Sequence, residues 1–185
     1  FNQYCMIVEA MTSNVQIQEY MNTTRTYADI RTNAYFNDVM KALQGIYKID
    51  PDTIQTAWIA DIDSNALVMS DGYIADETYM VSSRPWYKCV EVGHTTMTEP
   101  YEDVATGKLV LTVSTPVYNF AGKVIGVTGM DISLDNIIST VSQYKIGESG
   151  YVALLSSEGM FIYHPNQNLI NTYITGFEGN HRCGT

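Results

Sequence analysis

The stretch that decides the fold runs from Thr98 to Tyr118 and reads TEPYEDVATGKLVLTVSTPVY. In its second half, residues 108–117 alternate between two faces. One face is apolar and the other is more polar, with Leu109, Leu111, Val113 and Val117 on the first and Val110, Thr112 and Ser114 on the second. Turns are predicted at Thr106-Gly107 and at 119–123, and a further strand at 124–132. Such short connections predict antiparallel hairpins.

Further strands and a short helix are predicted upstream of this stretch. Residues 56–62 and 66–70 read as two strands joined by the turn residues Asp63-Ser64-Asn65. Asp71-Gly72 then opens a loop that runs through Ser83. Residues 84–92 are expected to form a short helix with Pro85 in its first turn and Gly93 as its stop.

Residues 1–47 carry a helical pattern that no proline interrupts. It is clearest near its end, in Phe36, Val39, Met40, Leu43, Ile46 and Tyr47. The pattern predicts a long N-terminal helix that reaches beyond the body of the domain. Two ordinary helices with a break near Thr23–Thr24 fit the sequence equally well.

The remainder of the chain predicts a second, smaller unit. Ser133 is a good N-cap for a helix that carries Leu134, Ile137, Ile138 and Val141. Strands are then expected at 151–155 and 160–163. The expected fold class is α+β: a long N-terminal helix (1–47), an antiparallel-sheet module (48–143) and a second module (144–185). The second module looks incomplete, because two strands are too few to close a sheet.

Composition excludes some classes of function. The 185 residues carry a net charge of −10 and only ten Lys and Arg residues, which are scattered, so no nucleic-acid partner is expected. No run of 18 apolar residues and no signal peptide is visible. We expect the chain to be a portion of a longer protein.

Neither the spacing of the cysteines nor any familiar catalytic motif indicates a metal site, a cofactor site or an enzyme. Cys5, Cys89 and Cys183 have no zinc-type spacing, and a Cys89–Cys183 disulfide remains open. The sequence has no phosphate loop, zinc-protease motif or nucleophile elbow. The least poor enzymatic alternative is a hydrolase that pairs Asp103 with Asp131. It needs one carboxyl with a raised pKa, and a nearby Arg84 would oppose that.

Several stretches together resemble the double Cache sensor domains of bacterial and archaeal chemoreceptors and sensor kinases. They are RPWY (84–87), TEPYEDVATGKLVLTVSTPVY (98–118), GKVIGVTGMDISLDNI (122–137) and KIGESGYVALLSSEGMFIYHPN (145–166). The resemblance covers nearly the whole chain and implies two stacked PAS-like antiparallel-sheet modules. It implies an extracytoplasmic domain of a receptor whose flanking transmembrane helices lie outside this chain, and a weak homodimer. The output domain, such as a histidine kinase or a chemotaxis transducer, would also lie outside the chain.

The amino-acid-binding branch of that family has a more specific motif, and every element is present here in order. The matching residues are Tyr79, Arg84, Trp86, Tyr87, Tyr101, Asp103 and Asp131. The resemblance implies that Arg84, Trp86 and Tyr87 hold the carboxylate of the ligand. It also implies that Tyr101, Asp103 and Asp131 hold its ammonium group.

The residue types suit that ligand independently of the resemblance. A guanidinium meets a carboxylate with two parallel hydrogen bonds, carboxylates accept from an ammonium, and aromatic faces attract cations. Tyr73, Asp76 and the strand at 56–62 are candidates for contacts with the ligand side chain. Three alternatives stay open: an Arg84–Asp131 ion pair with Trp86 and Tyr87 as core residues, an amine ligand, and a dimerisation module without a small ligand.

Overall fold

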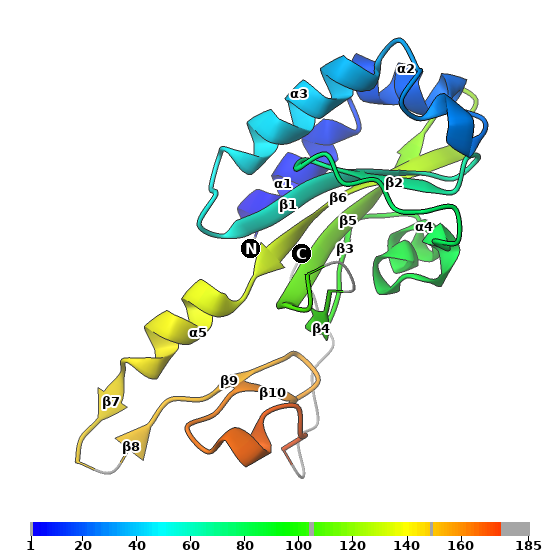
Figure 1. Ribbon diagram of the computed structural model, residues 1–185. Coiled ribbons are helices and arrows are strands. Elements are labelled where there is room, and N and C mark those ends of the chain that lie inside the picture. The colour runs from blue at the N-terminus through cyan, green and yellow to red at the C-terminus, as the bar shows by residue number, and fades with distance from the viewer. Residues whose placement is uncertain (1, 104–105, 149, 175–185) are drawn as a thin grey trace. The chain divides into compact units, whose positions relative to one another are not determined.

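The structure, a computed structural model, describes residues 2–103, 106–148 and 150–174 (Figure 1). The chain divides into two compact units. The first contains residues 1–98 and 112–132, and the second contains residues 99–111 and 133–185. The mixture of helices and antiparallel strands confirms the expected α+β class. The module boundaries expected near residues 48 and 144 stay predictions.

Three helices, not one, occupy the N-terminal region: α1 (Asn2–Met11), α2 (Val15–Thr23) and α3 (Phe36–Tyr47). The expectation of one continuous helix is therefore wrong, and the alternative break near Thr23–Thr24 is confirmed. A second break precedes Val15, because the Asn14 side chain accepts from the backbone N–H groups of Gln16 and Ile17 and so caps a new helix. The hydroxyl of Thr24 bonds back to the Tyr20 carbonyl at 2.8 Å where α2 ends.

The sheet of the first unit has the strand order β2-β1-β6-β5-β3. Its strands are β1 (Ile54–Asp61), β2 (Ala66–Met69), β3 (Thr96–Met97), β5 (Leu109–Tyr118) and β6 (Val124–Ser133). β1 runs antiparallel to β2 and β6, and β3 runs antiparallel to β5. The strands expected at 56–62, 66–70, 108–117 and 124–132 are confirmed. The sequence also predicts a strand at 98–104, where the structure has only the short β4 (Tyr101–Glu102), and residue 104 lies outside the described residues.

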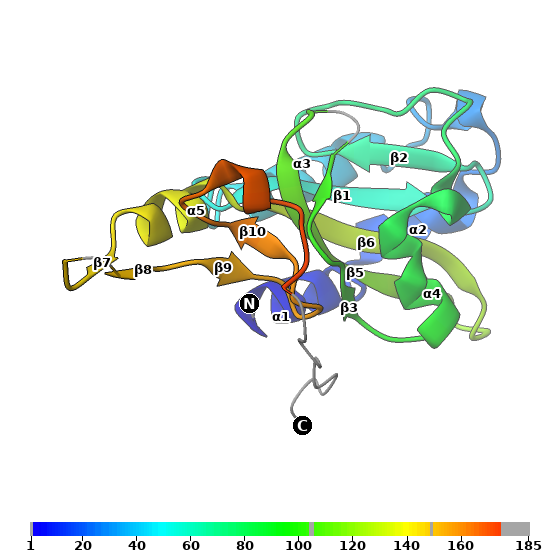
Figure 2. The ribbon, with the colours of Figure 1, turned by 90° about the horizontal axis from the view of Figure 1, so that it is seen from below.

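Helices cover one face of this sheet, and the segment that ends in α4 covers the other (Figures 1 and 2). On the first face, the Thr128 hydroxyl of β6 donates to the Val8 carbonyl of α1. On the opposite face lies a core cluster of Trp58, Ala60, Leu67, Met69, Ala75, Val81, Trp86, Cys89 and Val127. That segment contains η2 (Val81–Ser83), η3 (Pro85–Tyr87) and α4 (Lys88–Val92). Gly93 ends α4 in the left-handed conformation, as expected.

Asp61 is buried at the end of β1 on the helix-covered face. Its Oδ1 accepts from the backbone N–H and the hydroxyl of Ser64, which closes the turn to β2. Its Oδ2 has no hydrogen-bond partner among the residues that the structure describes. Desolvation, only partly opposed by the Ser64 hydrogen bonds, raises the pKa of this carboxyl from 3.8 to about 6. The sequence places Asp61 near the end of a predicted strand, and it does not reveal that the carboxyl is buried.

The second unit contains short elements. β4 (Tyr101–Glu102) pairs with the start of β5, and α5 (Asp135–Ser142) follows β6. β7 (Lys145–Ile146) pairs with β8 (Gly150–Tyr151), and β9 (Leu154–Leu155) pairs with β10 (Phe161–Tyr163) ahead of η4 (Gln167–Leu169). The helix after Ser133 is confirmed, but its N-cap residue is Leu134 and not Ser133 as predicted; the Ser133 hydroxyl accepts from the N–H of Asp135. His164 is buried and contacts the rings of Tyr151 and Phe161, which agrees with a structural role.

Candidate functional site

Asp131 lies on β6, on the face of the sheet that carries the core cluster. Only 3% of it is exposed. Its Oδ1 accepts two hydrogen bonds, one from the Thr112 hydroxyl at 2.6 Å and one from the Trp58 indole Nε1 at 3.2 Å. Donors from β5 and β1 therefore hold this carboxylate from the two strands that flank β6.

The register between β1 and β6 explains how Trp58 reaches Asp131. Trp58 is paired with Gly129, and Thr56 is paired with Asp131. The indole lies directly on the backbone of Gly129, because a Cβ atom built there would come within 2.3 Å of the ring. A glycine at 129 is therefore required for the ring to take this position. The same position brings Nε1 to the carboxylate two residues further along β6.

Arg84 lies in the loop that follows β2. Its guanidinium carbon is 5.2 Å from the centre of the Tyr79 ring, a cation–π distance. Pro85 keeps the Arg84 backbone extended, with φ −85° and ψ 145°. The Nε atom is buried, and no residue in the described part of the chain accepts its hydrogen. Burying such a donor without a partner is unfavourable, so the site favours an acceptor at this position.

The loop that carries Tyr79 and Arg84 is fastened to the sheet. The Asn65 side chain, in the turn between β1 and β2, accepts from the N–H of Val81 at 3.0 Å and donates to the Tyr79 carbonyl. Ile74 forms an isolated bridge with Val68 of β2. Asn65 has a positive φ of 55°, which suits asparagine. The turn residue predicted at 65 thus also positions a predicted site residue.

Trp86 and Tyr87 begin the short helical segment that follows. Trp86 belongs to the core cluster, and Tyr87 packs against that cluster while remaining partly exposed. The Trp86 ring centre is 4.5 Å from that of Trp58, and the Trp86 carbonyl accepts from the Ser114 hydroxyl at 2.9 Å. Trp86 is thus buried in the core cluster, where its ring contacts the indole that binds Asp131.

The ion-pair alternative is not supported. Arg84 forms no ion pair with any carboxylate of the described residues. The structure thus links Asp131 to Trp86 through Trp58, and Arg84 to Tyr79. Sequence reasoning missed Thr112, Ser114 and Asn65 as members of this arrangement. The alternation in residues 108–117 had already placed Thr112 and Ser114 on the polar face of β5, and that pattern could have identified both.

Tyr101 and Asp103 belong to the second unit. Tyr101 is paired with Val110 and lines a hollow of about 450 Å³ together with Leu109 and Met160. Asp103 is 7% exposed, and its Oδ2 accepts from the backbone N–H and the hydroxyl of Thr106 at 3.0 and 2.6 Å. Asp103 therefore closes the turn between β4 and β5. The assignment of both residues to a ligand stays a prediction that depends on the motif.

The two residues predicted to contact the ligand side chain lie at the surface. Tyr73 is 44% exposed, and Asp76 is also exposed. The Asp76 carboxylate accepts from the hydroxyl and the backbone N–H of Thr78, and these hydrogen bonds lower the pKa of Asp76. Asp76 therefore stabilises a local turn. The ligand contacts of Tyr73 and Asp76 stay predictions.

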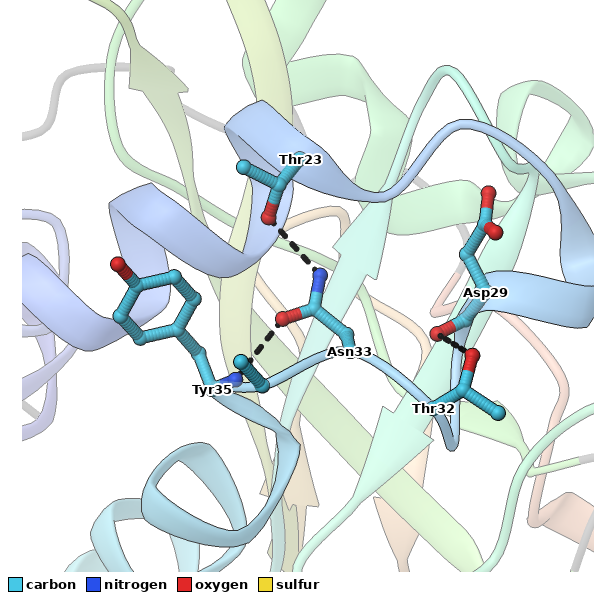
Figure 3. A pocket seen from close by; sticks show the side chains of 6 residues that line it. Thr23, Asp29, Thr32, Asn33 and Tyr35 are labelled. Atoms are coloured by element: carbon cyan, nitrogen blue, oxygen red, sulfur yellow. Dashed lines mark hydrogen bonds between the residues drawn. The ribbon is translucent and has the colours of Figure 1, made fainter.

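A polar hollow near the end of α2 is a weaker candidate site (Figure 3). It measures about 270 Å³ and is lined by Thr23, Asp29, Thr32, Asn33, Ala34 and Tyr35. The Asn33 amide donates to the hydroxyl of Thr23 at 2.9 Å and accepts from the N–H of Tyr35 at 2.9 Å. These groups bond to each other, and nothing in the hollow calls for a ligand.

The described residues hold no group of three or more His, Cys, Asp or Glu arranged for a metal ion. Cys5 and Cys89 form no disulfide within the described residues, and Cys183 lies outside them, so its pairing with Cys89 stays open. No helix within the described ranges has the length and apolar character needed to cross a bilayer.

Comparison with known proteins identifies the family. A family model described as a Cache domain matches residues 6–181. The chain belongs to the Cache family. Among curated proteins, this Cache chain is 38% identical over 93 residues to the methyl-accepting chemotaxis protein PscA of Pseudomonas syringae pv. tomato, covering 50% of this chain and 15% of PscA. It spans 14–18% of the length of PscA and two further chemotaxis proteins, McpG and PctB.

Solved ligand-binding domains share the Cache fold. The domain of the amino-acid chemoreceptor PctC of Pseudomonas aeruginosa, solved with GABA, has a TM-score of 0.64 at 20% identity, covering 91% of this chain and 68% of that one. The domain of the chemoreceptor CtaA of Pseudomonas fluorescens, solved with L-isoleucine, has a TM-score of 0.58 at 26% identity, covering 93% and 71%. These likenesses confirm the predicted Cache fold.

Proposed function

We propose that this Cache chain is the extracytoplasmic ligand-sensing domain of a transmembrane receptor, and that it binds a free α-amino acid. The observation that carries the proposal is the buried Nε of Arg84, a guanidinium donor that bonds to no residue the structure describes. A ligand carboxylate would supply the acceptor, and guanidinium binds carboxylate in a planar, two-bond geometry. A simple amine would leave this donor without a partner.

A second anchor of opposite charge supports the choice of an amino acid. The buried Asp131 carboxylate is suited to receive an ammonium group, and two donors already fix its orientation. Arg84 is only two residues from Trp86, whose ring contacts the indole that binds Asp131. Aromatic side chains around these anchors exclude water and strengthen both charge interactions.

The remaining residues of the motif have proposed roles of the same kind. Tyr79 orients the Arg84 guanidinium through its ring, and Trp86 and Tyr87 join Arg84 at the carboxylate. The motif alone assigns Tyr101 and Asp103 to the ammonium group of the ligand. The named ligands of related domains, GABA for PctC and L-isoleucine for CtaA, agree in carrying both an amino and a carboxylate group.

Signalling follows from a shift in a conformational equilibrium. A ligand changes the populations of two signalling states only by its difference in affinity for them. In the proposed receptor, flanking transmembrane helices anchor the protein, and two copies associate weakly. Equal affinity of the amino acid for locked on and off states would contradict this mechanism.

The test is a thermal-shift screen of the purified chain against the twenty proteinogenic amino acids, with simple amines and carboxylic acids alongside. A ligand at 100 times its Kd stabilises the folded protein by about 2.7 kcal/mol, which raises the melting temperature by several degrees. We expect some amino acids to give this shift, and amines and acids to give none.

Two variants locate the site. Arg84→Gln and Asp131→Asn should each weaken amino-acid binding by about 30-fold or more, because each removes one member of a buried charge pair. Arg31→Gln is a matched control, since Arg31 lies 6.0 Å from the Phe36 ring in a similar cation–π contact, away from the site. Binding of amines that survives Arg84→Gln would support the amine alternative. A blank screen with concentration-dependent dimerisation would support the interaction module.

A further inference from the structure

We infer that Thr112 and Trp58, two residues outside the recognised motif, are positioning residues that hold the Asp131 carboxylate for the ligand ammonium group. The inference rests on the proposed function, because it takes Asp131 as the ammonium anchor. It adds that the affinity of this anchor is set by neutral donors on the two strands that flank it.

Two hydrogen bonds to Thr98 fix the backbone of Thr112, and so fix the position of its hydroxyl. Thr112 is fully buried in β5. Its N–H donates to the Thr98 hydroxyl at 2.9 Å, and its carbonyl accepts from the Thr98 N–H at 2.9 Å. The 2.6 Å distance from its hydroxyl to Asp131 is in the range of a charge-assisted hydrogen bond. A fixed strand thus presents a strong donor to the carboxylate.

The Trp58 indole is fixed by packing. The ring rests on the backbone of Gly129, contacts the Trp86 ring and is 1% exposed. Trp86 is in turn tied to β5 through the Ser114 hydroxyl, which donates to its carbonyl. Because the ring cannot turn, its Nε1–H points at one place, which is Oδ1 of Asp131.

Two fixed donors on one oxygen determine the rotation of the whole carboxylate. An unsupported carboxylate rotates readily about its last side-chain torsion. Binding must then stop this rotation, and the lost conformational entropy lowers the affinity for the ligand. Hydrogen-bond donors that hold a binding group preserve its geometry before the ligand binds, as the hydrogen-bonded partners of metal ligands do. Thr112 and Trp58 support Asp131 in the same way, through their hydrogen bonds to its Oδ1.

The experiment uses single substitutions in the whole chain, and the probes are the twenty proteinogenic amino acids. Each amino acid that shifts the melting temperature of the wild type is then titrated calorimetrically into every variant. Thr112→Val keeps the shape of the side chain and removes the donor, and Trp58→Phe keeps a ring and removes the indole N–H. We expect each to weaken binding about tenfold, the size of one hydrogen bond to a charged group.

Two further variants separate positioning from stability. Thr112→Ser keeps the hydroxyl and loses the methyl group. It should therefore bind the ligand with nearly wild-type affinity, unlike Thr112→Val, even if the missing methyl contacts lower its stability. Thr128→Val is the matched control, because Thr128 is fully buried on β6 and its hydroxyl donates to the Val8 carbonyl on the opposite face. It should lower the melting temperature without changing the affinity.

A ligand-free measurement covers the case in which Thr112→Val does not fold. Each of the two tryptophans gives one indole N–H signal in a 15N–1H spectrum, and Trp58→Phe identifies the Trp58 signal. That signal should exchange slowly with solvent, and Asp131→Asn should move it. If Thr112→Val and Trp58→Phe bind with wild-type affinity, or if the Trp58 indole N–H exchanges rapidly with solvent, this inference is wrong while the proposed function can still hold. No binding of any amino acid to the wild type overturns the proposed function, and the inference with it.

Discussion

Replacing Asp61 by asparagine should stabilise the protein at neutral pH and not in acid. The folded state raises the pKa of the Asp61 carboxyl from 3.8 to about 6, mainly because burial desolvates it. Well below pH 3.8 the group is protonated in both the folded and the unfolded state, so it does not affect stability. As the pH rises from about 4 to 6, the unfolded state releases this proton while the folded state keeps it, so the free energy of unfolding falls; above pH 6 the folded state buries a charge and the loss stays constant.

The magnitude follows from the size of the shift. A rise of about two pKa units corresponds to about 3 kcal/mol of stability that the wild type lacks above pH 6. Asparagine keeps an acceptor for the N–H and hydroxyl of Ser64. Its amide nitrogen would replace Oδ2, which bonds to no described residue, so the buried amide gains no acceptor and part of the benefit is lost. The net gain expected at pH 7.5 is therefore about 1–2 kcal/mol.

The assay is urea unfolding of the wild type and Asp61→Asn, followed by tryptophan fluorescence at pH 4, 6 and 7.5. The informative quantity is the difference between the two proteins, because other titrating groups cancel in it. Asp38→Asn is the control, since Asp38 lies at the surface and pairs with Lys41 on its own helix. A difference that is the same at all three pH values would refute the reasoning.

Three further substitutions test other parts of the structure. Gly129→Ala places a methyl against the Trp58 ring, so we expect a loss of about 1–3 kcal/mol in a thermal melt, together with weaker amino-acid binding; an unchanged melting temperature would contradict the packing. Asn65→Gly keeps the positive φ but removes both side-chain bonds to the loop, and faster amide exchange at Tyr79 and Val81 should follow in hydrogen-exchange measurements. Asp103→Asn keeps an oxygen for Thr106, so the β4–β5 turn should survive by thermal melt; undiminished affinity in calorimetry would then remove Asp103 from the ligand site.

Local patterns predicted the strands because each depends on neighbouring residues. The alternation in residues 108–117 placed Thr112 and Ser114 on one face of β5, and the structure uses both hydroxyls there. Gly93 ended α4 for a local reason as well, since a positive φ favours glycine. The break before Val15 was missed because it depends on the Asn14 side chain capping a helix within a pattern that reads as helical throughout.

The arrangement around Asp131 depends on long-range register, which no local pattern contains. The sequence supplied Asp131 and Trp86 through a motif, but not Trp58, whose role requires the pairing of β1 with β6 opposite Gly129. The burial of Asp61 is similar, because it depends on helices that pack over the end of β1. Prediction from sequence therefore found the residues of the motif and missed the neutral donors that support it.

The fastening of the loop after β2 has a practical consequence for biosensor construction. Asn65 holds the loop at Tyr79 and Val81, and the bridge at Ile74 holds it on the other side. Between these points, residues 76–78 are exposed, and their hydrogen bonds to the described part of the chain stay within their own turn or reach the adjoining Tyr79 backbone. A cysteine introduced at Glu77 would carry an environment-sensitive dye on the loop that also carries Arg84, and it would leave the bonds of Asn65 and Ile74 intact. The same exposed interval is suited to inserted residues, so a fluorescent reporter can be attached without changing Arg84 or Asp131.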